Sequence, residues 1–235
     1  MAEPRPAARH APTQPRTRDR ILDVAIELFN ERGVQNVAAL HVARALDISP
    51  GHLGYHFKNK NAIVEAIFPQ IDASVRGALE APPRGEIAVS YAAAYQIRIF
   101  RTLWRYRFFF NGLSYVIVPG QPLYDQYLEL QAWVLGRLEQ LNDSLIAARQ
   151  MRPIEAPNST ALLARNTWTI WLGWLRLEQL SNPSTAVIER AAILDGVLQH
   201  FALNQPYYGR KFAQRLLDDL YRQLDAQYPD ATQDH

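Results

Sequence analysis

Apolar residues recur every three or four positions along most of the chain, which is the spacing of one face of an α-helix. The first such stretch follows Thr17, a helix-capping residue, and ends before Gly33, a typical terminator. The same spacing predicts further helices at about residues 61–79, 86–110, 123–150, 158–180, 184–201 and 209–228. Because no segment alternates apolar and polar residues for long, we expect an all-α protein.

Between residues 36 and 63 the pattern predicts two short helices joined by a tight turn. The apolar side of the first helix consists of Val37, Leu40, Val42, Ala43 and Leu46. Ser49 is a typical N-cap, and Pro50 suits the first position of the second helix because a helix start leaves that amide unbonded. The second helix is therefore predicted to begin at about Pro50.

The second of these helices has two distinct sides. Leu53 and Phe57 share one face at i, i+4 spacing and can pack inward, which directs His52, Tyr55 and His56 outward. A short helix that presents hydrogen-bond donors and an aromatic edge suits the major groove of DNA. The alternative is that the two histidines simply belong to a solvated face.

Basic residues follow this helix, and Lys58 and Lys60 stand where the next helix begins. A DNA phosphate there would meet both ammonium groups and the free amides of a helix start. The candidate DNA-binding residues are Arg44, Ser49, Pro50, Gly51, His52, Tyr55, His56, Lys58 and Lys60.

Residues 17–68 resemble the DNA-binding domain of the tetracycline-repressor (TetR) family. The residues that carry the resemblance are Ile21, Ala25, Leu28, Phe29, Gly33, Val42, Ala43, Ile48, Ser49, Gly51, Leu53, Tyr55, His56, Phe57 and Lys60. The resemblance implies that the helix from Pro50 to His56 is the recognition helix, with Tyr55 and His56 near DNA and Lys60 on a phosphate. It also implies a homodimer that responds to a ligand and most often represses transcription.

The sequence departs from the family pattern in three ways. Val37 and Ala38 stand where a hydroxyl residue usually caps the first short helix, so we expect Asn36 to cap it instead. Asp47 replaces the turn glycine, which is tolerable because aspartate adopts left-handed conformations more readily than most residues. Gly54 replaces a common tyrosine, which costs the helix about 1 kcal/mol relative to alanine and removes one DNA contact.

The pattern divides the chain into four parts. We expect a disordered basic arm at 1–16, a helix-turn-helix domain at 17–60, a connecting helix at 61–81 and a ligand-binding and dimerisation domain at 82–235. The arm either reaches DNA or is a solvated tail. In the connecting helix, Pro69 is expected to cause a kink or a break, because proline removes one backbone hydrogen bond.

Aromatic residues are concentrated between Trp104 and Tyr115. They either fill a core or line a cavity for a hydrophobic or amphipathic effector, whose candidate residues are Trp104, Phe108, Phe109, Tyr115, Trp133 and Trp168. In the same region Arg98, Arg101 and Arg105 form a stripe at i, i+3 and i+7. The stripe is either a solvated face or contributes a side chain to a pocket for an acidic ligand.

The helix at 158–180 is apolar nearly all round, so it lies at the centre of its domain or a second subunit covers its outer face. The helix at 184–201 has a heptad-like apolar seam. This pair resembles the helices with which TetR-family proteins dimerise as a four-helix bundle. The candidate dimer residues are Trp171, Trp174, Leu175, Val187, Leu194, Leu198 and Phe201.

Composition adds limits on function. The chain contains no cysteine, and its six histidines lack metal-ligand spacing, so we expect no disulfide, metal site or cofactor. No phosphate-cradling loop or nucleophile motif indicates an enzyme. Residues 1–60 hold 9 basic against 6 acidic residues, a mild bias toward a polyanion.

These observations predict a cytoplasmic protein whose partners are double-stranded DNA, a second copy of the chain and a small hydrophobic effector, with no membrane attachment. The alternative is a DNA-binding regulator without a small-molecule effector, controlled by protein partners. A closed cavity of some hundreds of cubic ångströms in the helical bundle would favour the first function, and a solidly packed bundle would favour the second.

Overall fold

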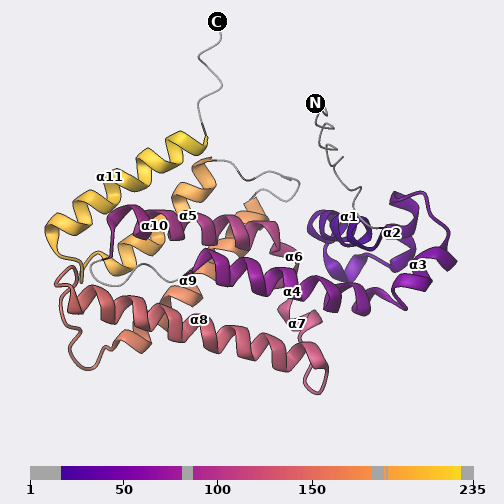
Figure 1. Ribbon diagram of the computed structural model, residues 1–235, viewed down its shortest axis with the longest axis horizontal. Helices are drawn as coiled ribbons and strands as arrows, with labels where there is room; N and C mark the ends of the chain where they lie inside the picture. Colours follow the sequence, from indigo (N-terminus) through magenta and orange to yellow (C-terminus); the bar gives the residue numbers. More distant parts are fainter. Residues whose placement is uncertain (1–16, 81–86, 182–187, 189, 229–235) are drawn as a thin grey trace, which may run out of the picture.

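The computed structural model describes residues 17–80, 87–181, 188 and 190–228 (Figure 1). The regular secondary structure within these ranges is helical, apart from one isolated bridge between Met151 and Tyr208. The predicted all-α class is confirmed. The elements are α1 (Thr17–Arg32), the short 3₁₀ helix η1 (Val34–Asn36), α2 (Ala39–Ala45), α3 (Pro50–His56), α4 (Lys60–Ala78), α5 (Val89–Arg105), α6 (Arg107–Asn111), α7 (Leu113–Val116), α8 (Pro122–Ala147), α9 (Thr160–Ser181), α10 (Arg190–Asn204) and α11 (Arg210–Gln227). The predicted arm at 1–16, the predicted domain boundary between residues 81 and 82, and Val187 lie outside the described residues.

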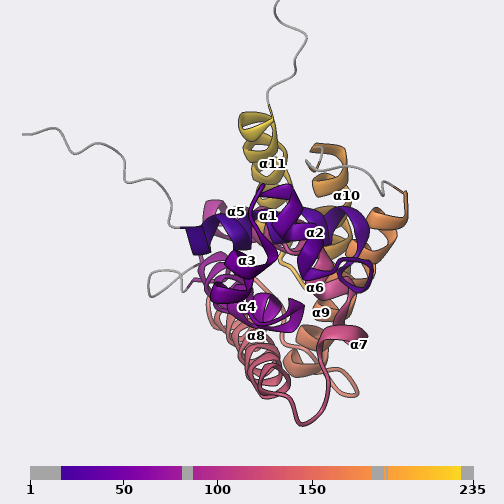
Figure 2. The same ribbon diagram turned by 90° about the vertical axis from the view of Figure 1, so that its right-hand side faces the viewer.

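The helices form a small group at one end and a larger bundle. Figure 1 shows α1, α2 and α3 together on the right, and in Figure 2 this end of the molecule faces the viewer. Helix α4 contacts α1 on one side and α5 and α8 on the other, so it connects the two groups. Helix α5 is central to the bundle, where it contacts α4, α9, α10 and α11, while α8 packs along α9. Among the described helices, none is both long and apolar enough to cross a lipid bilayer.

The small group is held together by a compact apolar core. Ile21, Ala25 and Phe29 of α1 are fully buried, and Val42 and Ala43 of α2 pack beside them. The prediction that Asn36 caps α2 is wrong. Helix α2 starts after Ala38, which has no capping side chain, and Asn36 instead donates a hydrogen bond to the Arg32 carbonyl. Val37 is 1% exposed and packs in the core between Asn36 and the start of α2. The helix therefore begins too far along the chain for Asn36 to cap it.

The connecting helix does not break at Pro69. Helix α4 runs without interruption from Lys60 to Ala78, and Asn59 caps its start by accepting a hydrogen bond from the Ala62 amide at 2.9 Å. Pro69 lies on the exposed side of α4. Its ring therefore faces solvent, and the apolar side of the helix, including fully buried Ile67 and Ile71, packs without interruption.

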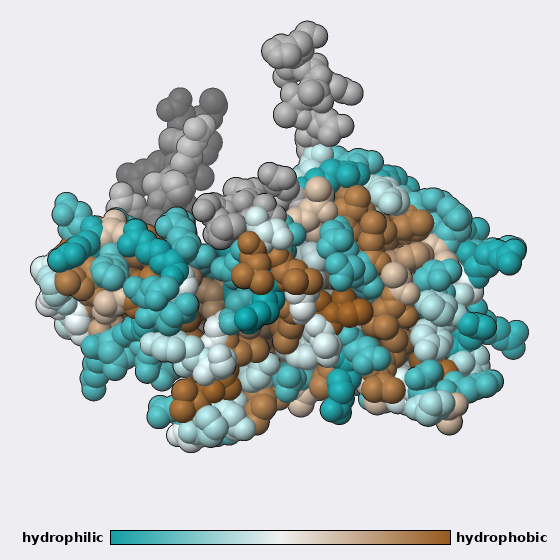
Figure 3. Space-filling view, turned by 180° about the vertical axis from the view of Figure 1, so that it is seen from behind, coloured by the Kyte–Doolittle hydropathy of each residue, from teal (hydrophilic) through white to brown (hydrophobic). Residues whose placement is uncertain are grey.

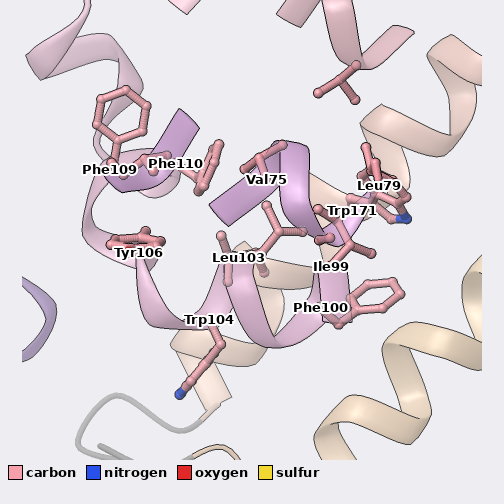
Figure 4. Packing of buried hydrophobic residues seen from close by; sticks show 14 of the residues in the cluster. Val75, Leu79, Ile99, Phe100, Leu103, Trp104, Tyr106, Phe109, Phe110 and Trp171 are labelled. Atoms are coloured by element: carbon pink, nitrogen blue, oxygen red, sulfur yellow. The ribbon is translucent and has the colours of Figure 1, made fainter. Parts of the chain in front are cut away.

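The predicted helix at 86–110 is divided by a corner. Helix α5 ends at Arg105, Tyr106 leaves the helical conformation, and α6 then starts in a new direction. Gly112 separates α6 from α7, and a side chain there would come within 2.6 Å of the Phe108 carbonyl oxygen. The corner turns the aromatic run into the interior, where Figure 4 shows Tyr106, Phe109 and Phe110 beside side chains of α4 and α5.

Helices α8, α9 and α11 lie close to their predicted positions. Ser159 caps α9 by accepting a hydrogen bond from the Leu162 amide at 3.0 Å. Helix α10 is described from Arg190 onward, and residues 184–187, where its start is predicted, lie outside the described ranges. Helix α11 packs along α5, and its apolar side is buried through Leu216, Leu220 and Leu224.

Candidate nucleic-acid interface

Helix α3 is fixed to the small helical group by its two ends and its inner side. Ser49 caps it as predicted, accepting a hydrogen bond from the His52 amide at 3.1 Å, and Pro50 is its first residue. Asp47 adopts the left-handed conformation, with φ at 53°, which closes the turn between α2 and α3. Leu53 and Phe57 are 3% and 5% exposed and anchor the inner side. The opposite side of α3 is therefore presented to solvent in a defined orientation.

The outer side of α3 carries an aromatic group of three rings. Tyr55 is 86% exposed, and its ring lies edge-on to His56 with 5.3 Å between the centroids. His52 stacks on His56 at 5.6 Å. Gly51 and Gly54 are exposed beside these rings, and a Cβ on Gly54 would contact nothing within 4 Å. The three rings and the adjacent glycines form a projecting ridge that is free to meet base edges.

The predicted basic residues divide into two groups. Arg44 on α2 and Lys58, which follows α3, are both exposed. Lys60, predicted to meet a phosphate, is instead drawn inward: its ammonium donates to the Val34 carbonyl at 2.7 Å and lies 4.8 Å from the centroid of the Tyr115 ring. These contacts tie the start of α4 to both η1 and α7. Positions 58 and 60 are both lysine, so only their tertiary contacts distinguish their roles.

Two connections between the helical groups had no signal in the sequence pattern. Asn30 of α1 is 7% exposed, donates to the Arg105 carbonyl at 2.9 Å and accepts from the Phe108 amide at 3.0 Å. Beside it, the rings of Phe29 and Phe108 lie 5.2 Å apart. The corner between α5 and α6 thereby holds the end of α1, so the small helical group is attached to the bundle through specific bonds.

The six predicted effector residues lie in different surroundings. Phe108, Phe109 and Trp168 are buried in the core at 5% exposure or less. Tyr115 is 46% exposed on α7, and Trp133 is half-buried on α8, where the Arg76 guanidinium lies 4.6 Å from its ring centroid. The remaining member of the predicted set, Trp104, lines an open cleft beside α1.

The predicted dimer residues also separate by burial. Trp171, Trp174 and Leu175 are at most 1% exposed, so they lie inside the bundle and contribute no surface to a partner. Leu194, Leu198 and Phe201 of α10 are half-buried, and on α9 the side chains of Leu177 and Leu180 are 62% and 71% exposed. Figure 3, seen from behind, shows apolar residues gathered on the side of the molecule where α9 and α10 lie. An apolar face of the bundle is therefore open to solvent.

A buried polar cluster lies behind this face. The Trp171 indole donates to His200 Nδ1 at 3.0 Å, and the other ring nitrogen of His200 lies 3.4 Å from the Tyr95 hydroxyl. Burial lowers the pKa of His200 to about 3, so its ring is neutral at physiological pH. A neutral ring is also required for Nδ1 to accept the indole hydrogen bond.

Comparison with known proteins assigns both helical groups. Residues 21–67 match the model of bacterial regulatory proteins of the tetR family. Residues 71–216, more than half of the chain, match the TetR model described as a bacterial transcriptional repressor. The chain belongs to the TetR family. It is accordingly a transcriptional regulator and not an enzyme, and α2 and α3 correspond to the helix-turn-helix of the TetR DNA-binding domain.

Curated relatives of this TetR-family chain match over its N-terminal part. The HTH-type transcriptional regulator UidR of Escherichia coli K12 is 35% identical over 75 residues, which are 32% of this chain and 38% of the relative. The class D tetracycline repressor protein of Escherichia coli is 32% identical over 90 residues, covering 38% of this chain and 41% of the repressor. Each alignment thus spans less than half of either protein.

Solved structures extend the similarity over nearly the whole chain. A TetR-family transcriptional regulator from Marinobacter aquaeolei VT8 is 27% identical, with a TM-score of 0.77 over 92% of this chain and 100% of that one. A complex of SmeT with triclosan has a TM-score of 0.59 at 20% identity and covers 83% of this chain and 93% of SmeT. At that identity the second comparison supports the fold alone.

Proposed function

We propose that this TetR-family regulator binds a near-palindromic operator as a homodimer and represses transcription until a small molecule releases it. The observation that carries the DNA-binding part is the orientation of α3. Leu53 and Phe57 are buried, while Tyr55 is 86% exposed on the opposite side. A helix anchored in this way can lie in the major groove with its outer residues against base edges.

In this interface the ridge of His52, Tyr55 and His56 contacts base edges. The exposed start of α3 and the neighbouring cations contact the phosphate backbone of the DNA. Of the three cations in the predicted set, Arg44 and Lys58 are exposed and can meet phosphates, whereas the ammonium of Lys60 is engaged within the protein. Phosphate contacts fix the position of the helix, whereas contacts to base edges determine the sequence.

The apolar face formed by α9 and α10 supports the homodimer. A contiguous exposed apolar patch is typical of an interaction site, and a second copy of the same face would remove Leu177 and Leu180 from water. Two subunits related by a two-fold axis place two α3 helices in successive major grooves, so the operator half-sites are expected about 34 Å apart or at a multiple of one helical turn.

The effector part of the proposal requires that a ligand bind the two DNA-binding geometries with different affinity, because only that difference can shift DNA binding. The alternative function, a regulator controlled by protein partners alone, predicts a bundle without a cavity of ligand size. An open cleft of about 990 Å³ between α1 and α5 is large enough for a small molecule, but it is not the closed cavity within the bundle that the small-molecule function predicts.

The decisive experiment selects genomic fragments from the host that bind the purified chain and then measures their affinity for variants. Replacing Tyr55 and His56 with alanine is expected to reduce fragment binding at least a hundredfold, while circular dichroism and dimer mass stay unchanged. The matched control is Tyr221→Ala, which removes a partly exposed tyrosine from α11 and should bind normally. Normal binding by the Tyr55 and His56 double variant would exclude the outer side of α3 from the interface.

A further inference from the structure

An open cleft of about 990 Å³ lies where the DNA-binding domain meets the bundle. Helix α1 forms one wall, α4 forms a second, and α5 with the start of α6 forms the third. Asn30, which joins α1 to the corner between α5 and α6, is among the lining residues. A molecule bound in this cleft would therefore touch both domains beside the bonds that hold them together.

The α5 wall of the cleft is positively charged. The arginine stripe of Arg98, Arg101 and Arg105 lines it together with Arg107 from α6, against two carboxylates on the α1 wall. Arg98 donates to the Ala78 carbonyl at 3.2 Å and Arg101 to the Gln227 side-chain oxygen at 2.8 Å, so both have neutral partners. Within the described part of the chain, no member of the stripe forms an ion pair.

The two carboxylates on the opposite wall do not neutralise this stripe. Asp23 and Glu27 are exposed on α1, and neither forms an ion pair with any residue in the described ranges. The three guanidinium groups of the stripe therefore face two carboxylates across a space large enough for an organic molecule. An anion in the cleft would gain charge-assisted hydrogen bonds from arginines that remain charged at every physiological pH.

A second, independent feature of the cleft is an unpaired hydrogen-bond donor. Trp104 is 3% exposed, yet its indole nitrogen has no hydrogen-bond partner among the residues that the structure describes. Figure 4 shows this nitrogen pointing away from Leu103 and Ile99, which belong to the core. Buried polar groups in proteins are nearly always hydrogen-bonded, so an unpaired indole N–H beside a cavity indicates a missing acceptor. Ile26 and Ile188 add apolar surface to the same cleft.

We propose that this cleft binds a small organic anion, a molecule with one acidic group and an apolar body. The acidic group lies among Arg101, Arg105 and the Trp104 indole N–H, and the apolar body lies against the α1 wall at Ile26. The regulatory consequence rests on the proposed function: an anion that joins α5 to α1 favours one orientation of the DNA-binding domain over others, and thereby changes operator affinity. The arginine stripe that the sequence leaves open between a solvated face and an acidic-ligand site would then belong to the ligand site.

The test uses the purified full-length chain and a matched pair of fluorescent probes, anilinonaphthalene sulfonate and its uncharged counterpart phenylnaphthylamine. In the double variant Arg101→Ala/Arg105→Ala the dissociation constant of the sulfonate should rise about tenfold or more, because two charge-assisted contacts are lost. The control variant Arg210→Ala/Lys211→Ala removes two exposed charges from α11, outside the cleft, and should shift that constant less than about twofold. Binding of the uncharged probe should be equal in the two double variants.

A third variant examines the indole donor. Trp104→Phe keeps an aromatic ring in the wall and removes the N–H, so the sulfonate should bind about three- to tenfold more weakly while the uncharged probe is unaffected. Circular dichroism of each variant must match the wild type. Equal affinity of the sulfonate for the stripe variant and the α11 control would overturn the proposed site.

Failure of this site and failure of the proposed function give different results. If no genomic fragment binds the wild-type chain, the regulator proposal fails, but the probe titrations still decide whether the cleft holds anions. If the stripe variant binds fragments normally and the sulfonate shows no preference for the cleft, DNA binding stands and the anion site is excluded.

Discussion

The attachment of the DNA-binding domain to the bundle depends on Asn30, and its replacement by alanine is predicted to destabilise the protein measurably. Asn30 is 7% exposed and makes two hydrogen bonds across the domain boundary, to the Arg105 carbonyl at 2.9 Å and from the buried Phe108 amide at 3.0 Å. Asn30→Ala leaves both backbone groups without a partner inside the protein. Each unsatisfied buried group costs roughly 1–3 kcal/mol, with the partly buried carbonyl at the lower end.

The expected loss in the free energy of unfolding is therefore about 2–4 kcal/mol. It is measured by urea denaturation at a fixed protein concentration, since a dimer gains apparent stability by mass action. The control is Asn166→Ala, which removes an exposed asparagine from α9 and should change stability by less than about 0.5 kcal/mol.

Two outcomes of this experiment separate the roles of Asn30. If the bonds also fix the orientation of α1, Asn30→Ala will weaken binding to operator fragments under conditions in which the variant remains folded. A free energy of unfolding equal to that of the Asn166→Ala control would refute the reasoning, because it would mean that solvent replaces both hydrogen bonds without cost.

Three further predictions follow from the bundle. The pKa of His200 is about 3 in the folded chain and about 6.5 when unfolded, so only the unfolded state gains a proton as pH falls below 6.5. The free energy of unfolding should therefore drop by up to about 1.4 kcal/mol per pH unit. His200→Gln should flatten this part of a plot of melting temperature against pH. Gly196→Ala should lower the free energy of unfolding by about 1–3 kcal/mol, because the new Cβ would lie 2.7 Å from the Phe100 ring. The control Gly136→Ala has nothing within 4 Å of its new Cβ and should raise that free energy by up to about 1 kcal/mol. Urea denaturation measures both. Leu177→Glu should convert dimers to monomers in analytical sedimentation. The control Leu128→Glu, on an exposed part of α8, should leave the dimer intact. If the Leu177→Glu variant stays dimeric, the interface lies elsewhere.

Local features of the recognition helix could be predicted from sequence because they depend on neighbouring residues. Ser49 and Pro50 start α3 through a side chain and a ring that act within one turn, and Asp47 closes the preceding turn by its own backbone conformation. The spacing of Leu53 and Phe57 sets which side of α3 faces inward, whatever lies on the other side of the core. Fold class follows in the same way from repeated apolar spacing.

Features that depend on distant segments were decided by the tertiary structure. Lys58 and Lys60 are equivalent in sequence, but only Lys60 lies within reach of the Val34 carbonyl and the Tyr115 ring, which come from other helices. Trp171 fits a dimer seam by its spacing, yet contact with His200 of α10 places it in the interior.

The arginine stripe on α5 illustrates the same division. Periodicity places its members on one side of a helix, and helical spacing alone is enough to determine that. Whether that side meets water, a carboxylate or a ligand depends on where α1 and α4 lie, and their positions result from contacts between residues far apart in the chain. Short-range rules fix the face of each helix, while the packing of all the helices together determines what that face encounters.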